Sequence, residues 1–241
     1  MAANSLMAAN SLPLVLVPAL LCDAALYTEA ITHLGAAVEA QVLMSPKPRL
    51  EDSAEDILAR APARFALVGT SYGGNLALQI ALTAPERVIA LCLSGCDPMA
   101  PSTGGPDLAA GLESSPDPVI EMLAGLVVKP EATAAKAVFK AMAARVGAEA
   151  GAAQARALAV RSEVTSRLHT LSMPVLVLWG EEDALAPTAD GQKLAEAFPN
   201  AHFHMLKDCG HLPSLEKPAE YAALLGQFLA GATARSQGKG D

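Results

Sequence analysis

The chain has 241 residues, of which 52% are hydrophobic and 17% are charged, so it is long enough and apolar enough to bury the core of one α/β domain. A formal net charge of -8, without a long basic run, argues against nucleic acid or an anionic membrane surface as a partner. The four cysteines contain no C-x-x-C pair and are too few for a disulfide scaffold in a chain of this size, so we predict buried, reduced thiols in a cytoplasmic protein.

The N-terminus carries a repeat, because residues 1–6 recur identically at residues 7–12. We interpret this as a local duplication without a packed structure of its own, with Met7 as a second candidate start. The apolar run at residues 12–21 follows no positive charge, and Pro13 and Pro18 bracket a segment of strand length within it, so we predict a buried strand and not a secretion signal. No other stretch approaches the roughly 20 apolar residues needed to cross a bilayer.

Short apolar runs then alternate with helix-forming segments along most of the chain. Within the runs, apolar and polar residues do not alternate, which is typical of parallel strands covered by helices on both faces. We expect strands at residues 14–17, 38–44, 65–68, 88–93, 174–179 and 201–206, and helices at residues 23–34, 52–60, 75–82, 189–197 and 218–229. The predicted fold class is therefore α/β with a mostly parallel sheet.

Residues 97–170 interrupt this rhythm. They begin with a loop rich in proline, glycine and serine and continue as helix, with Val138, Met142 and Val146 at four-residue spacing. An insertion after the fourth strand would lie over the carboxyl ends of the strands, where α/β sheets bind ligands, so we expect a helical cap. The expected organisation is a disordered duplicated segment, a core in two parts, the cap and a flexible tail: residues 1–12, 13–96 with 171–231, 97–170 and 232–241.

The third predicted strand leads into the pattern G-x-S-x-G at Gly69, Ser71 and Gly73. A sharp strand-to-helix turn there would raise Ser71 above the end of the sheet and direct the start of the next helix toward it, which favours negative charge. Glycine is required on both sides, because a side chain would collide with the neighbouring strand or helix. The alternative is an incidental serine in a glycine-rich turn, so the rest of the chain has to supply partners for Ser71.

A serine hydroxyl is a weak nucleophile and needs a base, together with a carboxylate that orients the base. Of the five histidines, His211 follows a strand and a glycine turn at the carboxyl edge of the sheet, whereas the other four suit structural roles better. Asp183 also lies just past a strand end, and Asp97 follows the fourth strand at the same edge. The order Ser71, Asp183, His211 is the order nucleophile, acid, base, with Asp97 as the alternative acid.

A metal cluster is the other interpretation of the region around His211. His202 and His204 face the same side of a predicted strand, and together with Cys209 and His211 they could bind zinc. No carboxylate or further cysteine completes this set at a familiar spacing, so we predict no metal and no cofactor.

At these motifs the chain resembles the α/β-hydrolase family, over residues 14–96 and 172–230. The matching motifs are Gly69-x-Ser71-x-Gly73-Gly74 for the nucleophile elbow, Gly180-x-x-Asp183 with Pro187 for the acid loop, and Asp208-x-Gly210-His211 with Glu216 and Pro218 for the histidine loop. The resemblance implies a triad of Ser71, Asp183 and His211 and favours Asp183 over Asp97. It also implies a cap that shapes substrate choice. The short segment before the first strand leaves no room for the hairpin of many relatives, so we expect six strands and not eight.

The resemblance further implies an oxyanion hole made of two backbone N–H groups, those of Leu20 and Tyr72. Leu20 follows Pro18-Ala19, where the family usually has a glycine in place of the alanine. If the backbone there required a positive φ, Ala19 would be strained and the hole imperfect.

Three functions of different classes fit these residues. The first is a serine hydrolase that cleaves a small carboxylic ester or lactone through an acyl-enzyme on Ser71, without a cofactor. The second is a carbon–carbon bond hydrolase or enol-lactonase with the same triad, and the third is a non-catalytic binding protein, against which an intact triad argues. Residues 88–128 contain five carboxylates and no lysine or arginine, so we expect a neutral, apolar small-molecule substrate. The sequence gives no indication of the oligomeric state.

Overall fold

The computed structural model describes residues 11–101 and 105–237. Most of the duplicated segment that we predicted to be disordered, residues 1–10, lies outside the described residues. Leu12 already belongs to the first strand, so the expected boundary between that segment and the core is one residue too late there.

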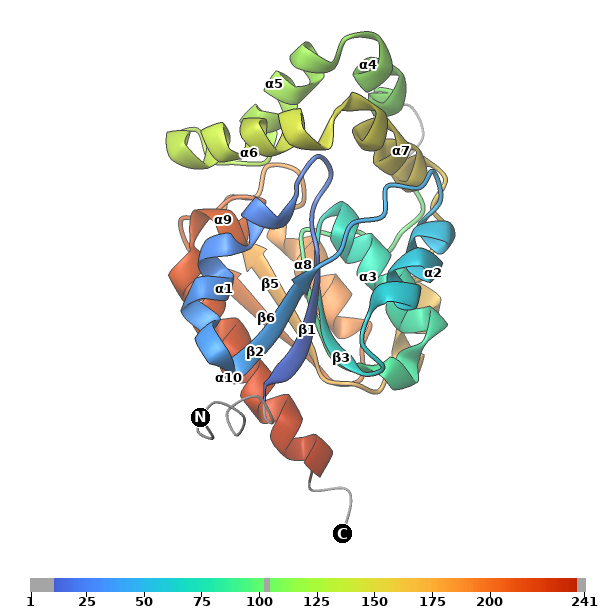
Figure 1. Cartoon of the computed structure of the whole chain (residues 1–241), viewed down its shortest axis with the longest axis vertical. Helices are drawn as coiled ribbons and strands as arrows, with labels where there is room; N and C mark the ends of the chain where they lie inside the picture. Colours follow the sequence, from blue (N-terminus) through green and yellow to red (C-terminus); the bar gives the residue numbers. More distant parts are fainter. Residues whose placement is uncertain (1–10, 102–104, 238–241) are drawn as a thin grey trace, which may run out of the picture.

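Six strands form one sheet, in which every neighbouring pair is parallel and the order is β2-β1-β3-β4-β5-β6. The strands are β1 (Leu12–Val17), β2 (Val38–Val42), β3 (Phe65–Thr70), β4 (Val88–Ser94), β5 (Val175–Gly180) and β6 (Ala201–Leu206). The α/β class, the parallel sheet and the number of six strands are therefore confirmed. Because the strands are parallel, their carboxyl ends meet at one edge of the sheet, just below the inserted helices (Figure 1).

Helices cover both faces of this sheet (Figure 1). On one face lie α1 (Thr28–Leu34) and α10 (Pro218–Gln237), and on the other lie α2 (Leu50–Arg60), α3 (Tyr72–Thr83) and α8 (Thr188–Glu196). Along β1, Leu14 and Leu16 pack toward α1 and α10, whereas Val15 and Val17 pack toward α2 and α3. Successive side chains of a strand point to opposite faces, which explains why a strand buried on both faces is apolar without a break.

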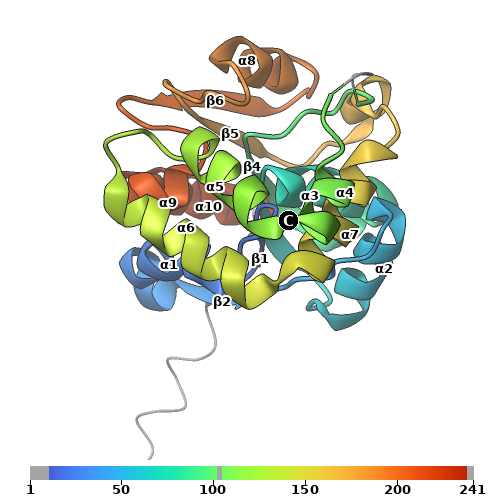
Figure 2. The same ribbon diagram turned by 90° about the horizontal axis from the view of Figure 1, so that it is seen from above.

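The segment between β4 and β5 lies over the carboxyl ends of the strands, and seen from above its helices cross the sheet (Figure 2). It contains α4 (Leu108–Ser114), α5 (Pro116–Leu126), α6 (Thr133–Val146), α7 (Ala148–Ala159) and the 3-10 helix η4 (Thr165–Thr170). Of the expected apolar stripe, Met142 is fully buried, and Val138 and Val146 are half-buried against the same core as α1 and α10. The stripe therefore packs mainly as core.

Three helical segments differ from expectation. The helix expected at residues 23–34 is divided into the 3-10 helix η1 (Ala24–Leu26) and α1 at Tyr27, whose φ of -115° and ψ of -2° depart from α-helical values. The Asp23 carboxylate accepts a hydrogen bond from the Ala25 N–H and caps the start of η1. A short helix that was not expected, α9 (Pro213–Glu216), follows His211. The predicted flexible tail is wrong for residues 232–237, because α10 continues to Gln237 and Ala232 is buried.

All four cysteines are free and buried, as the sequence predicted. Burial raises the pKa of the Cys92 thiol to about 12, so this group stays protonated near neutral pH. Among the described residues, no helix is both long enough and apolar enough to cross a membrane.

Candidate active site

The turn from β3 into α3 has the geometry expected of a nucleophile elbow. Ser71 has φ 56° and ψ -117°, a conformation that L-residues rarely adopt and that costs about 1–3 kcal/mol. The turn is possible because its neighbours are glycines: a Cβ at Gly69 would lie 2.7 Å from the Ala77 Cβ, and one at Gly73 would lie 2.6 Å from the Val17 carbonyl carbon. The Ser71 N–H donates to the Ser94 carbonyl at 2.7 Å, which holds the half-buried serine at the carboxyl edge of the sheet.

His211 and Asp183 are brought together at the same edge, after β6 and β5 respectively. The His211 Nδ1 lies 2.7 Å from the Asp183 Oδ2, and both side chains are almost completely buried. The Asp183 Oδ1 accepts hydrogen bonds from the N–H groups of Leu185 and Ala186, both at 2.9 Å, so the carboxylate is fixed from both sides. Since a carboxylate can only accept, the histidine donates from Nδ1 and keeps a lone pair on Nε2. That nitrogen is buried and has no hydrogen-bond partner within the described residues.

Two glycines allow these loops to approach one another. Gly95, directly after β4, has φ 61°. A Cβ there would lie 2.6 Å from Cε1 of the His211 ring, so the imidazole packs directly against the backbone of Gly95. A Cβ at Gly180 would collide with the carbonyl oxygen of Gly210, which shows how tightly the acid loop packs against the histidine loop.

Asp97, the alternative acid, points away from His211. Its side chain is 55% exposed, and its carboxylate contacts the Arg161 guanidinium at 3.2 Å and accepts a hydrogen bond from the Met99 N–H. The structure therefore brings Asp183, and not Asp97, to the imidazole. Asp97 joins the start of the insertion to the loop that follows α7.

The two residues expected to form an oxyanion hole, Leu20 and Tyr72, follow the neighbouring strands β1 and β3. The Tyr72 N–H is in the first turn of α3, where it has no partner within the helix. Within the described residues, neither this N–H nor that of Leu20 donates to a backbone carbonyl of a turn or loop. Ala19 is buried without a positive φ, so the strain considered for it is absent. The left-handed residue is Leu21, with φ 60°.

The metal cluster considered as an alternative is not assembled. His202 and His204 are exposed on β6 at the edge of the sheet, whereas Cys209 is buried and His211 is bound to Asp183. Within residues 11–101 and 105–237, no group of three or more His, Cys, Asp or Glu side chains is arranged to hold a metal ion.

Comparison with known proteins identifies the family. A family model described as "Alpha/beta hydrolase family" matches residues 16–224, which include all five candidate site residues. The chain belongs to this family. Among solved structures, it resembles a thermophilic esterase from Thermogutta terrifontis, with a TM-score of 0.82 and 22% identity over 92% of this chain and 91% of the other. It also resembles the enol-lactonase from Burkholderia xenovorans LB400, with a TM-score of 0.82 and 18% identity over 92% of both chains. These likenesses confirm the fold.

The similar curated proteins are named as hydrolases. The chain is 31% identical over 181 residues to a 2-hydroxy-6-oxononadienedioate/2-hydroxy-6-oxononatrienedioate hydrolase of Paraburkholderia phymatum, and 30% identical over 181 residues to a 2-hydroxymuconate semialdehyde hydrolase of a Pseudomonas species. These alignments cover 69% and 70% of this chain, respectively, and 62% of each relative. The chain thus matches less than two thirds of the length of these relatives.

Tyr27 is a residue of this alpha/beta hydrolase that sequence reasoning missed. Its buried hydroxyl donates to the Val17 carbonyl at 3.0 Å and, because a carbonyl can only accept, it accepts the hydrogen bond from Thr70 Oγ1 at 2.8 Å. These bonds join the end of β1, just before the Leu20 loop, to the end of β3, just before Ser71. Nothing in the local sequence distinguishes this tyrosine from one that packs only as core.

Glu216, which the sequence suggested only as part of a motif, binds the backbone around His211. Its carboxylate accepts hydrogen bonds from the Leu212 N–H at 3.4 Å and from the Lys129 N–H, in the loop between α5 and α6, at 3.2 Å. Burial raises the pKa of Glu216 above its ordinary value, against the opposing effect of these N–H donors. The carboxylate therefore links the His211 loop to the inserted helices.

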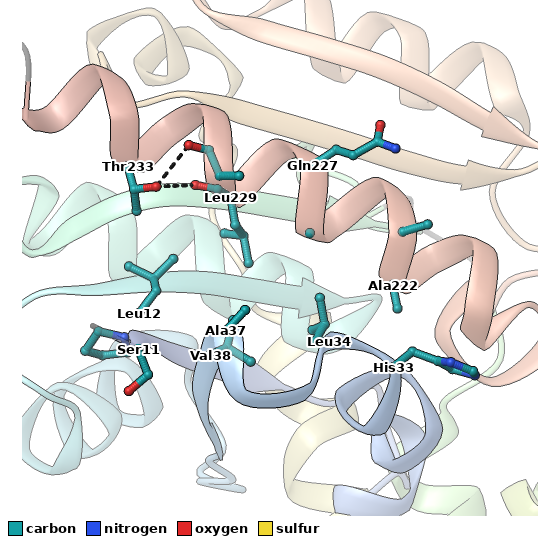
Figure 3. A pocket seen from close by; sticks show the side chains of 14 residues that line it. Ser11, Leu12, His33, Leu34, Ala37, Val38, Ala222, Gln227, Leu229 and Thr233 are labelled. Carbon is teal, nitrogen blue, oxygen red and sulfur yellow. Dashed lines mark hydrogen bonds between the residues drawn. The ribbon is translucent and has the colours of Figure 1, made fainter. Parts of the chain in front are cut away.

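A cavity of about 780 Å³ lies at the other end of the strands and is distinct from this site (Figure 3). The start of β1 at Leu12, His33 of α1 and the middle of α10, from Ala222 to Thr233, line it. Thr233 projects from α10, and its hydroxyl is already satisfied by the carbonyls of Leu229 and Ala230, both at 3.0 Å. Because parallel sheets bind substrates at the carboxyl ends of their strands, the candidate active site is the edge that carries Ser71 and not this cavity.

Proposed function

We propose that the protein is a serine hydrolase that cleaves a small carboxylic ester or lactone through an acyl-enzyme on Ser71. The observation that carries the proposal is the buried His211, bound through Nδ1 to Asp183 with Nε2 unpartnered, at the same sheet edge as a serine held in an elbow conformation. A base that is oriented on one nitrogen and free on the other is what activation of a serine requires.

In the proposed reaction, Ser71 Oγ attacks the carbonyl carbon while its proton passes to Nε2 of His211. The carbonyl oxygen becomes negative in the tetrahedral intermediate, where the N–H groups of Leu20 and Tyr72 stabilise it. The carbon–oxygen bond then breaks, and the alcohol leaves with the proton from His211. A water molecule attacks the acyl-enzyme with His211 again as base, which releases the acid and restores the Ser71 hydroxyl. Asp183 keeps the imidazole in the required tautomer throughout.

The proposed substrate is neutral and apolar on its acyl side, and the charges of the cap support this. Residues 88–128 carry no cation, and most cations in the second half of the cap are already occupied. Five of these cations contact carboxylates, namely Lys129, Lys140, Arg145, Arg156 and Arg161. A sixth, Lys136, donates a hydrogen bond to a backbone carbonyl. Away from Arg167, the seventh cation of the cap, a substrate carboxylate would have to displace one of these partners or remain unpaired, and an unpaired buried charge costs several kcal/mol.

The second candidate is hydrolysis of a carbon–carbon bond with the same three residues. The name of the Paraburkholderia phymatum relative supports this candidate over a hydrolase of neutral esters. That relative is named as the hydrolase of two dioates, which are compounds with two carboxylates. The seventh cation of the cap, Arg167, is exposed on η4. It could bind a second substrate carboxylate without breaking an ion pair.

A substrate panel distinguishes these candidates. Purified protein and its Ser71→Ala variant are assayed with chromogenic esters of short and medium acyl chains, with lactones and with a vinylogous 1,5-diketone acid of the ring-cleavage type. We expect turnover of esters or lactones that Ser71→Ala abolishes while its melting temperature stays within a few degrees of the wild type. Turnover of the diketone acid alone would establish the second candidate, and ester turnover that survives in Ser71→Ala would contradict the proposed nucleophile.

A further inference from the structure

A buried glutamine connects the cap to the loop of the proposed oxyanion hole. Gln154 lies on α7 and is 2% exposed, and its Oε1 accepts a hydrogen bond from the Leu21 N–H at 2.9 Å. The two residues are 133 positions apart in the chain, so this bond joins the inserted helices directly to the segment that follows β1.

Leu21 is the residue of this loop that most needs such support. Its φ of 60° lies in the left-handed region, which is unfavourable for a side chain with a Cβ, so the surrounding contacts must hold the backbone there. The peptide group between Leu20 and Leu21 carries the N–H that Gln154 binds. The Leu20 N–H belongs to the preceding peptide group, which is joined to this one through the Cα of Leu20. Holding one peptide group therefore restricts the φ and ψ values open to Leu20, and with them the direction of its N–H.

Gly151, three residues before Gln154 on α7, supports the same loop. A Cβ at this position would lie 3.2 Å from the Leu21 Cγ and would collide with Cδ2 of the same side chain. Residues three apart lie on the same face of a helix. The glycine therefore lets α7 approach closely enough for the glutamine to reach the backbone of Leu21, whose side chain is completely buried.

We infer that Gln154 is a positioning residue for the oxyanion hole: by holding the Leu21 N–H, it keeps the Leu20 N–H directed at the oxygen that becomes negative. The inference rests on the proposed serine hydrolase function and deepens it. It makes the cap responsible for transition-state stabilisation as well as for covering the substrate. Without the glutamine oxygen, the Leu21 N–H is left buried and unpaired, and the peptide turns toward another acceptor and takes the Leu20 N–H out of position.

The test replaces Gln154 with methionine, which keeps the length and volume of the side chain but has no amide oxygen. With an ester that the wild type turns over, we expect kcat of Gln154→Met to fall about 10- to 100-fold, somewhat less than the loss on removing an oxyanion donor outright. KM should stay within about twofold, because the ground-state carbonyl depends little on the hole. The inhibition constant of a trifluoromethyl ketone, whose hemiketal oxygen occupies the hole, should rise by the same factor as kcat/KM falls. Gln192→Met, at an exposed glutamine of α8, is the matched control and should leave all three quantities unchanged.

Gly151→Ala gives a second and independent perturbation, because it crowds Leu21 while leaving the Gln154 amide intact. We expect a loss of kcat in the same direction, although alanine is the better helix former. A merely structural Gln154 would lower the melting temperature and leave kcat and the ketone inhibition unchanged, and that result in an active enzyme would overturn this inference alone. A wild type that hydrolyses none of the esters or lactones would overturn the proposed function and this inference together. If Gln154→Met fails to fold, an unchanged kcat in Gly151→Ala would overturn the inference.

Discussion

Replacing Gly95 with alanine tests whether the position of the His211 ring sets the activity. The added Cβ would lie 2.6 Å from Cε1 and 3.0 Å from Nδ1 of the imidazole. To restore an ordinary contact of 3.4 Å, the ring would have to move by about 0.8 Å. The ring cannot make this move without cost, because it is buried and bound to Asp183 at 2.7 Å.

The expected magnitude follows from this displacement. A misplacement of about 1 Å at a reacting group can lower a rate about 100-fold, so we expect Gly95→Ala to lose about 100-fold in kcat/KM. The positive φ of 61° adds about 1–2 kcal/mol of backbone strain, which for a chain of this size lowers the melting temperature by several degrees.

Gly35 offers a matched control for the strain alone. It has φ 60°, and a Cβ there would meet no heavy atom within 4 Å, so Gly35→Ala introduces a positive φ at alanine without a collision. The assay is steady-state kcat/KM on the best ester from the panel, with a thermal melt of each variant. We expect both variants to lose stability and only Gly95→Ala to lose activity. A kcat/KM for Gly95→Ala within about threefold of that for Gly35→Ala would refute the claim that the close contact with Gly95 positions the His211 ring for activity.

Two further predictions concern the acid and the substrate. Asp183→Asn should lower kcat by about 10⁴, the loss seen when an asparagine fixes the wrong imidazole tautomer in the serine-protease template, whereas Asp97→Asn should change it less than about threefold because Asp97 contacts Arg161 and not the imidazole. Steady-state kinetics of both variants decide this, and the opposite ranking would reverse the assignment. For the substrate, kcat/KM for a butyrate ester should exceed that for the mono-succinate ester of the same alcohol by at least about tenfold, which corresponds to about 1.4 kcal/mol of uncompensated charge burial. A preference for the succinate would contradict the neutral-substrate proposal and favour the carbon–carbon hydrolase.

The sheet could be predicted from the sequence because burial on both faces leaves an unbroken apolar pattern. The four central strands β1, β3, β4 and β5 are such runs, whereas the edge strands β2 and β6 alternate between polar, exposed residues and partly buried ones. The elbow and histidine loops are marked by glycines whose close contacts the structure explains, such as Gly73 packed against Val17 and Pro18. The juxtaposition of Asp183 and His211 also followed, because residues that come after parallel strands must meet at one edge. In these cases the local pattern and the topology point to the same arrangement.

Other features depend on contacts between distant segments and leave no local signal. Tyr27, between η1 and α1, binds the end of β1, and Gln154 of α7 binds the loop that follows it. The local sequence around neither residue predicts these hydrogen bonds. The positive φ considered for Ala19 occurs at Leu21, whose contacts with Gly151 and Gln154 come from a distant part of the chain. The last helix extends to Gln237 because its alanines favour helix and Ala232 finds a buried position, neither of which the polar composition of the segment suggested.

The central claim is that Ser71 is a nucleophile activated by His211, and covalent labelling tests it most directly. Folded protein is incubated with a fluorophosphonate probe, which needs an activated serine beside an oxyanion hole, and the intact mass is measured before peptide mapping. We expect one adduct per chain at Ser71 in the wild type, none in Ser71→Ala and much slower labelling in His211→Ala. A wild-type mass without an adduct, or equal labelling of Ser71→Ala, would contradict the claim.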